Sequence, residues 1–191
     1  MELLRCQWPG NDDLMQQYHD YEWGTPVHDD NKWFEFLLLD AFQAGLSWKT
    51  ILHRREGFRK AFDNFDFEKI AQYDESHYER LINDTGIIRN RAKVRGTIKN
   101  AQALIAIRQE FGSFDNYIWK FTDGKTIVTH CKQMSDIPVR TEVSDMISKD
   151  LKKRGFSFVG STICYAFMQA AGIVNDHVED CFRFAVCCGK E

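Results

Sequence analysis

Two pairs of cysteine and histidine residues lie near opposite ends of this chain of 191 residues. Twelve residues separate Cys6 from His19, and three separate His177 from Cys181. Two thiolates and two imidazoles form a donor set that suits tetrahedral zinc, and four protein ligands leave no open position for a reactive water. Such a set, with His177 and Cys181 on one helix face, would hold a structural Zn²⁺ that joins the two ends of the chain.

The alternative interpretation is a pair of buried histidines among unpaired cysteines. The chain has six cysteines but no CxxC pair, and Cys187 and Cys188 offer competing ligands. The stretch Met1–Cys6 contains Arg5 before any signal-type apolar run, and no apolar run approaches the roughly 20 residues that cross a bilayer. We expect a cytoplasmic protein without membrane attachment, in which metal binding or burial explains the cysteines better than disulfides do.

Asp40 is an acidic residue in an apolar segment, Phe36–Gly45. It lies near the C-terminal end of an expected helix, where the helix dipole and burial both disfavour an anion. Aromatic walls and one carboxylate would suit a flat, positively charged ligand, through stacking, cation–π attraction and a charge-assisted hydrogen bond. Core packing of the rings and a solvent-reaching or capping carboxylate are the alternatives. The large rings nearby are Trp8, Tyr18, Trp23, Trp33 and Trp48.

The segment 81–93 is typical of a helix, a glycine-containing turn and a second helix with an asparagine cap. From Gly86 to Lys99 the chain carries five cations and no acid, although its net charge is −3. A glycine turn lets the backbone approach a phosphate, and the free N–H groups of a helix start attract anions. We expect a helix-hairpin-helix on the DNA backbone, because a mere connector between core helices would not need a basic second helix. Arg89 and Arg91 can grip adjacent phosphates.

Helical periodicity dominates the chain and only three prolines interrupt it, so the expected fold class is all-α. Capping residues and glycines predict the boundaries. The expected helices run from Asn11 or Asp12 to about Asp20, from Asp29 or Asp30 to Gly45, from Ser47 to about Gly57, from Asp74 through Ile82, from Asn90 to Phe111, from Ser144 to Gly155 and from Gly160 to Gly172. In the helix after Asn90, Val94, Ile98, Ala101 and Ile105 should share one buried face. The stretch 125–130 could be extended but is too isolated to form a sheet.

Distinctive short motifs occur along nearly the whole chain. They are Cys6-x-Trp8, Tyr18-His19-Asp20-x-Glu22-Trp23-Gly24, Gln43-Ala44-Gly45-Leu46-Ser47-Trp48, Gly86-Ile87-Ile88-Arg89-Asn90-Arg91, Leu151-Lys152-Lys153-Arg154-Gly155-Phe156-x-Phe158-Val159-Gly160, Thr162-Ile163-Cys164-Tyr165-x-Phe167-Met168-Gln169-Ala170 and Gly172-x-Val174-Asn175-Asp176-His177. In residue type and in order, these motifs resemble the 3-methyladenine DNA glycosylase I family, part of the helix-hairpin-helix DNA glycosylase superfamily.

The resemblance implies a two-lobed, all-α helix-hairpin-helix glycosylase fold over a single unit, 1–191, with the hairpin at about 78–99. It also implies a structural zinc that joins segments 6–19 and 177–181. The ligands would be Cys6, His19, His177 and Cys181. The flipped base would lie between the lobes, with Asp40 as the catalytic carboxylate. The hairpin residues on the DNA backbone would be Gly86, Ile87, Ile88, Arg89, Asn90 and Arg91. The pocket residues would be Trp8, Tyr18, Trp23, Gln43 and Trp48.

The reaction that the resemblance implies is hydrolysis of the N-glycosidic bond of 3-methyladenine in alkylated double-stranded DNA, a step of base-excision repair. The nucleotide has to be flipped out, because the bond at C1′ is unreachable in a paired duplex. No motif places a lysine as nucleophile. We therefore expect a monofunctional enzyme, acting as a monomer, that releases free 3-methyladenine and leaves an abasic site.

Two positions depart from the family pattern. Asp40 stands where the family usually has glutamate, and Met15 where it commonly has tyrosine. Aspartate is one methylene shorter, so the rate or the range of accepted bases should differ, and Met15 should remove a ring from the pocket. Two other functions are possible for such a sequence. One is a lesion-binding protein without activity, and the other is a zinc hydrolase, which would require an open coordination position.

Overall fold

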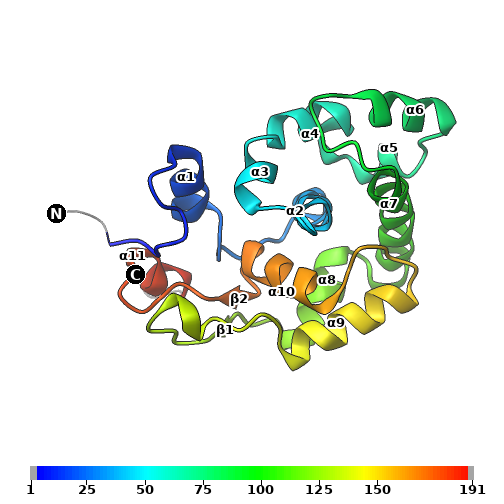
Figure 1. Cartoon of the computed structure of the whole chain (residues 1–191). Coiled ribbons are helices and arrows are strands. Elements are labelled where there is room, and N and C mark those ends of the chain that lie inside the picture. The colour runs from blue at the N-terminus through cyan, green and yellow to red at the C-terminus, as the bar shows by residue number, and fades with distance from the viewer. Residues whose placement is uncertain (1–3, 189–191) are drawn as a thin grey trace.

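The computed structural model describes residues 4–188, and this part of the chain is mostly helical. Figure 1 shows helices on both sides of a central helix, α2. The helices are α1 (Asp13–Tyr21), α2 (Asp30–Gln43), α3 (Trp48–Leu52), α4 (Arg55–Ala61), α5 (Phe67–Ile70), α6 (Glu75–Asn83), α7 (Arg91–Phe111), α8 (Phe114–Trp119), α9 (Glu142–Lys153), α10 (Ser161–Ala170) and α11 (Phe182–Cys187). Single 3₁₀ turns are η1 (Asp63–Phe65), η2 (Lys120–Thr122) and η3 (Met134–Asp136), and the strands are β1 (Ile127–Val128) and β2 (Val174–Asn175). The prediction of an all-α protein is confirmed in its main feature.

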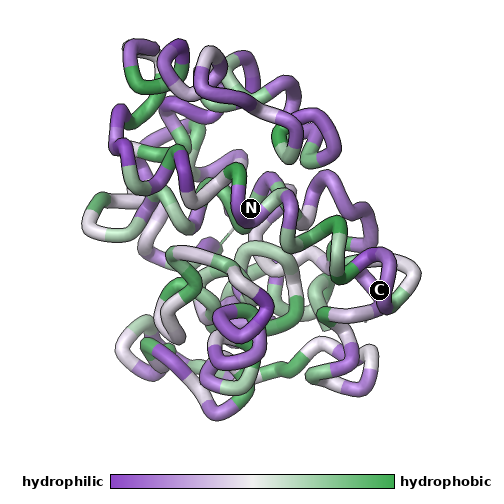
Figure 2. Tube along the Cα trace, turned by 90° about the vertical axis from the view of Figure 1, so that its right-hand side faces the viewer, coloured by the Kyte–Doolittle hydropathy of each residue, from purple (hydrophilic) through white to green (hydrophobic). Residues whose placement is uncertain are grey.

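Helix α2 forms the centre of the core. Every residue from Trp33 to Phe42 is buried, and the helix packs against α3, α7, α8 and α10. A helix that is apolar almost all round has to lie inside the protein. Around it, Figure 2 shows hydrophobic stretches alternating with hydrophilic ones along the chain, as expected for amphipathic helices that share a core. The position of Asp40 on α2 therefore places a carboxylate in the interior.

The predicted helix starts are confirmed at five positions. Asp12, Asp29, Ser47, Asp74 and Asn90 each precede a helix, and each side chain accepts a hydrogen bond from a backbone N–H of the first turn. These bonds satisfy N–H groups that have no partner inside the helix. Local sequence was therefore sufficient to predict these boundaries.

The prediction of one helix from Ser47 to Gly57 is wrong, because the chain breaks at residues 53–54 and restarts as α4. The restart directs Arg55 toward two carboxylates, with Nη1 2.7 Å from Glu22 Oε1 and Nε 2.8 Å from Glu35 Oε1. An uninterrupted helix would give Arg55 a different direction. The tertiary ion pairs thus override the local helical pattern.

Two further details differ from the predictions. Helix α9 begins after Thr141, and Ser144 is the third helical residue, where its side chain accepts a hydrogen bond from the Thr141 backbone N–H. On α7 the buried face includes Val94 and Ala101, whereas Ile98 and Ile105 are half-buried at its edge. The face turns because α7 packs against helices on more than one side, namely α5, α6 and α8.

The stretch 125–130 is not isolated, contrary to the prediction. Strand β1 pairs in parallel with β2, with Ile127 opposite Val174 and Val128 opposite Asn175. The partner strand comes from a segment 46 residues later, as the hydrogen bond between Thr126 and Gly172 illustrates. None of the helices in residues 4–188 combines the length and the apolar character needed to cross a bilayer.

Candidate functional site

A cavity of about 370 Å³ lies between the N-terminal segments and α10. All the residues predicted to form the pocket line it: Trp8, Tyr18, Trp23, Asp40, Gln43 and Trp48. The structure adds lining residues that were not predicted to form the pocket: Met134, Ile137, Pro138, Val139, Thr162, Tyr165, Ala166, Gln169 and Ala170. The lining residues from α10 recur at helical spacing on one face, and this pattern is visible in the sequence. Met15, in contrast, is buried in the core and does not line the cavity, so its effect there is not direct.

The aromatic rings of the cavity meet one another at an angle. The Trp8 and Trp23 ring centroids lie 5.2 Å apart at 68°, and those of Tyr18 and Trp48 lie 4.9 Å apart at 46°. Inclined pairs of this kind are favoured by the ring quadrupoles. Because neither pair is stacked face to face, no ring of a pair lies flat over its partner.

Three buried polar atoms of the cavity residues have no hydrogen-bond partner within residues 4–188: Trp8 Nε1, Trp48 Nε1 and Asp40 Oδ2. Leaving a buried donor or acceptor unsatisfied costs roughly 1–3 kcal/mol each. Burial also raises the pKa of Asp40 well above its usual range, which favours the neutral acid in the free protein. A planar ligand with acceptors, donors and a positive charge would complement these two donors and this carboxyl oxygen in kind.

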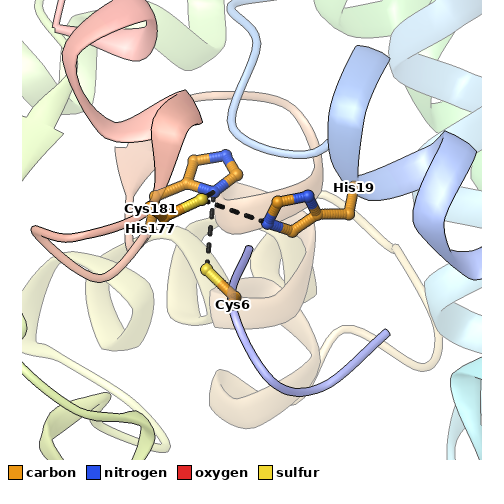
Figure 3. Close-up of side chains that lie close together, drawn as sticks. All are labelled: Cys6, His19, His177 and Cys181. Atoms are coloured by element: carbon orange, nitrogen blue, oxygen red, sulfur yellow. Dashed lines mark hydrogen bonds between the residues drawn. The ribbon is translucent and has the colours of Figure 1, made fainter. Parts of the chain in front are cut away.

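The four predicted metal ligands come together in one cluster (Figure 3). Cys6, His19, His177 and Cys181 are all buried, and their ligand atoms lie within 4.8 Å of one another. The Cys6 Sγ to His177 Nδ1 distance is 3.6 Å, and Cys181 Sγ lies 3.5 Å from His19 Nε2. Ordinary Zn–S and Zn–N bonds at tetrahedral angles would separate S and N by about 3.6 Å. The donor set and its dimensions therefore fit a tetrahedral metal ion.

The prediction that His177 and Cys181 share a helix face is wrong. Both lie between β2 and α11, in a loop that turns where the Cys181 N–H donates to Val178 O. Pairing of β2 with β1 keeps the chain extended up to Asn175, so a helix cannot begin there. Cys187 and Cys188 lie outside the cluster.

Both imidazoles of the cluster are held by a second hydrogen bond. His19 Nδ1 lies 2.8 Å from Asp20 Oδ1, and Arg5 holds the same carboxylate through two nitrogens. His177 Nε2 lies 3.0 Å from the backbone oxygen of Trp23. Such bonds orient metal-binding histidines. They also connect the cluster to a cavity wall, because Trp23 belongs to both.

The predicted hairpin joins α6 to α7 through residues 84–90. The Gly86 N–H donates to Asp84 Oδ1 at 2.7 Å, which closes the turn. The backbone N–H groups of Ile87, Ile88 and Arg89 donate to no group within residues 4–188. Together with the N-terminus of α7, they form a row of donors suited to an anion. The six residues singled out from the sequence thus form one contiguous segment at a helix start.

Fewer of the cations near the hairpin are available to a ligand than the sequence suggested. Lys93 is buried and donates to Phe42 O at 2.8 Å and to Ala44 O at 2.6 Å, at the C-terminus of α2. Burial lowers the pKa of Lys93. Arg95 is paired with Glu75. Charge counting along the sequence could not distinguish these cations from exposed ones.

Gly57 on α4 is required for the position of the hairpin. A Cβ at this position would lie 2.3 Å from the backbone oxygen of Gly86. We expect Gly57→Ala to displace the hairpin and to destabilise the protein by roughly 1–3 kcal/mol, measured by urea denaturation. Gly160→Ala is the matched control, because Gly160 has a negative φ and a methyl group there would have no neighbour within 4 Å. Equal stabilities of the two variants would contradict the packing argument.

The fold and the site together define a class: a helical protein with an aromatic, partly polar cavity beside a buried Cys₂His₂ cluster. Residues 8–184 match the family described as Methyladenine glycosylase, and the chain belongs to this family. This confirms the resemblance seen in the sequence.

Individual relatives agree with this assignment. The chain is 48% identical over 179 residues to DNA-3-methyladenine glycosylase 1 of Escherichia coli strain K12, covering 94% of this chain and 96% of that protein. It is 45% identical over 177 residues to the DNA-3-methyladenine glycosylase of Haemophilus influenzae strain ATCC 51907, covering 93% and 96%. It also resembles, with a TM-score of 0.91 and 34% identity, a crystal structure of a tyrosine-to-phenylalanine variant of 3-methyladenine DNA glycosylase I in complex with 3-methyladenine, covering 93% of this chain and 96% of that chain.

Proposed function

We propose that this protein hydrolyses the N-glycosidic bond of 3-methyladenine in alkylated double-stranded DNA and leaves an abasic site. The observation that carries the proposal is the cavity, with aromatic walls and three unsatisfied polar atoms from Trp8, Asp40 and Trp48. Relatives at 45–48% identity are named for this activity, and they match nearly the whole chain. Residues 1–191 then act as one glycosylase unit and as a monomer.

The cavity complements a flipped adenine that is alkylated at N3. Alkylation makes the base cationic, so it is attracted to ring faces and to a carboxylate. The exocyclic amine is a donor and N7 an acceptor, which match Asp40 and the tryptophan N–H groups in kind. Binding of the cationic base should lower the pKa of Asp40 and so favour its ionised form, because a nearby positive charge stabilises a carboxylate.

The chemical step requires little beyond this binding. A cationic base is already a good leaving group. The protein needs only to hold the departing base and to stabilise the positive charge that develops on the sugar in the transition state. No lysine is among the described residues that line the cavity, so an attack by an amine on C1′ is not part of the proposal. Water completes the hydrolysis. Strand cleavage by β-elimination in a preparation free of lyases would contradict this mechanism.

The metal that the cluster would hold is zinc, with a structural role. Cys6, His19, His177 and Cys181 supply four protein ligands, which leave no position for a water or a substrate. When bound, the ion would contribute folding free energy by joining the N-terminal and C-terminal segments. A zinc hydrolase is not favoured for the same reason.

Arg89 and Arg91 at the hairpin are proposed to contact DNA phosphates. Both are exposed. Arg89 is the last residue of the row of free backbone N–H groups, and Arg91 is the first residue of α7. We expect Arg89→Ala and Arg91→Ala each to weaken binding to duplex DNA of any sequence, and to reduce the slope of log K against log salt by about 1. Fluorescence anisotropy over a salt series measures both effects. Lys125→Ala, at an exposed position before β1, is the control and should leave the slope unchanged.

The test of the proposed function is chromatography of the bases released from methylated duplex DNA. Release of 3-methyladenine by the wild-type protein is the expected result. Tight binding to methylated DNA without release would instead indicate the lesion-binding protein.

A further inference from the structure

A second buried carboxylate, Asp176, lies behind the wall of the cavity that α10 forms. It follows β2 directly and is 0% exposed. Its Oδ2 accepts hydrogen bonds from the Tyr165 hydroxyl and from Gln169 Nε2, each at 2.7 Å, and its Oδ1 accepts one from Thr129 Oγ1 at 2.6 Å. Tyr165 and Gln169 are one turn apart on α10, and both line the cavity. Asp176 thus holds two cavity residues from behind.

The bond to Asp176 determines the direction of the Gln169 amide. Gln169 Nε2 donates to Asp176 Oδ2 at 2.7 Å, so the amide nitrogen faces the carboxyl group and the carbonyl oxygen faces away from it. No donor within residues 4–188 binds Gln169 Oε1, and this oxygen is not among the fully buried side-chain atoms that lack a partner. The carbonyl is therefore available to a ligand in the cavity.

We propose that Gln169 is a specificity-determining residue whose Oε1 accepts a hydrogen bond from the amino edge of a purine, and that Asp176 is the positioning residue that fixes this orientation. A fixed acceptor favours a 6-amino purine and repels the 6-oxo group of a guanine. The inference rests on the proposed function, because it concerns the same cavity. It assigns to this wall a preference for alkylated adenine over alkylated guanine.

The Asp176→Asn variant tests the positioning role. An asparagine side chain can donate to Gln169, which allows the Gln169 amide to rotate and to present its NH₂ group to the cavity. We expect release of 3-methyladenine from methylated DNA to fall about tenfold or more, and the ratio of 3-methyladenine to 3-methylguanine to fall with it. The double variant Asp176→Asn with Gln169→Glu should restore the ratio, because the introduced asparagine then donates to a carboxylate whose other oxygen faces the cavity.

Further variants and measurements separate this role from a general loss of structure. Gln169→Met removes the acceptor itself and should lower the ratio as Asp176→Asn does. Thr129→Val removes one bond to Asp176 on the side away from the cavity and should keep the ratio. Melting temperature and zinc content are compared for every variant, because Asp176 is adjacent to His177 in the chain. The affinity of each variant for free 3-methyladenine is also measured, by quenching of tryptophan fluorescence.

An unchanged ratio in both Asp176→Asn and Gln169→Met would overturn the inference, as would a folded, zinc-loaded double variant that does not recover. Failure of the proposed function has a different signature, namely no base release by the wild-type protein. In that case the affinities for the free base decide: weaker binding in Gln169→Met and recovery in the double variant support the inference, and equal binding, or none by any protein, overturns it.

Discussion

Replacing Asp40 by asparagine is expected to slow the release of 3-methyladenine about 100-fold under single-turnover conditions, an effect of roughly 3 kcal/mol. Asp40 is the one carboxylate among the described residues that line the cavity, and no group within residues 4–188 donates to it. Asparagine keeps the size of the side chain but cannot become an anion beside a cationic base. Chromatography of released bases measures the effect.

The same substitution should stabilise the folded protein at neutral pH. Burial raises the pKa of Asp40, so the folded state holds this proton more tightly than the unfolded state. A group of this kind contributes stability at low pH, and the contribution is lost as pH rises above the unfolded pKa of about 3.9. The melting temperature of Asp40→Asn relative to the wild-type protein should therefore increase from about pH 4 to pH 7, measured by calorimetry.

Asp40→Glu is the matched control, because it retains the carboxylate and restores the residue usual in the family. We expect it to keep base release within about tenfold of the wild-type rate. Loss of release in Asp40→Asn together with a lower melting temperature would indicate a folding defect instead. Unchanged release would remove Asp40 from the mechanism while leaving the glycosylase activity in place.

Loss of a metal ligand is expected to have the largest effect on stability. Cys181→Ser leaves three donors in a buried cluster that joins the two ends of the described chain. Structural zinc sites contribute several kcal/mol to folding, so the melting temperature should fall by about 10 °C or more, and chelation of the wild-type protein should have a similar effect. Affinity for the base should also fall, because Trp8 follows Cys6 closely and Trp23 accepts a bond from His177.

Cys188→Ser provides the control, since Cys188 is half-buried and lies outside the cluster. It should melt close to the wild-type temperature. Elemental analysis by mass spectrometry should find one zinc per chain in the wild-type protein and in Cys188→Ser, and less in Cys181→Ser. A metal-free wild-type protein with the same melting temperature before and after chelation would contradict the structural role of the cluster.

Several features of this protein follow from local sequence alone. A capping side chain such as Asp12 or Asn90 bonds to N–H groups two or three residues away, so the helix starts could be predicted without knowledge of distant contacts. The family motifs and the donor set of the metal cluster were equally recognisable, because they depend on residue type and order. Each of these properties is short-range or compositional.

Other features depend on contacts between distant segments. The break after α3 follows from the ion pairs of Arg55, and the pairing of β1 with β2 joins segments 46 residues apart. Burial decides which cations are available, since Lys93 is used to cap α2. Most of the α10 wall, with Gln169 held by Asp176, was likewise not predicted.

The sequence by itself determined five of the helix starts, the candidate ligands and the family to which the chain belongs. Only the tertiary structure decided which of these side chains are buried, which are already paired and which are left unsatisfied around the cavity. The physical reason is that the cost of a buried polar atom depends on its surroundings, and those surroundings come from residues far away in the chain.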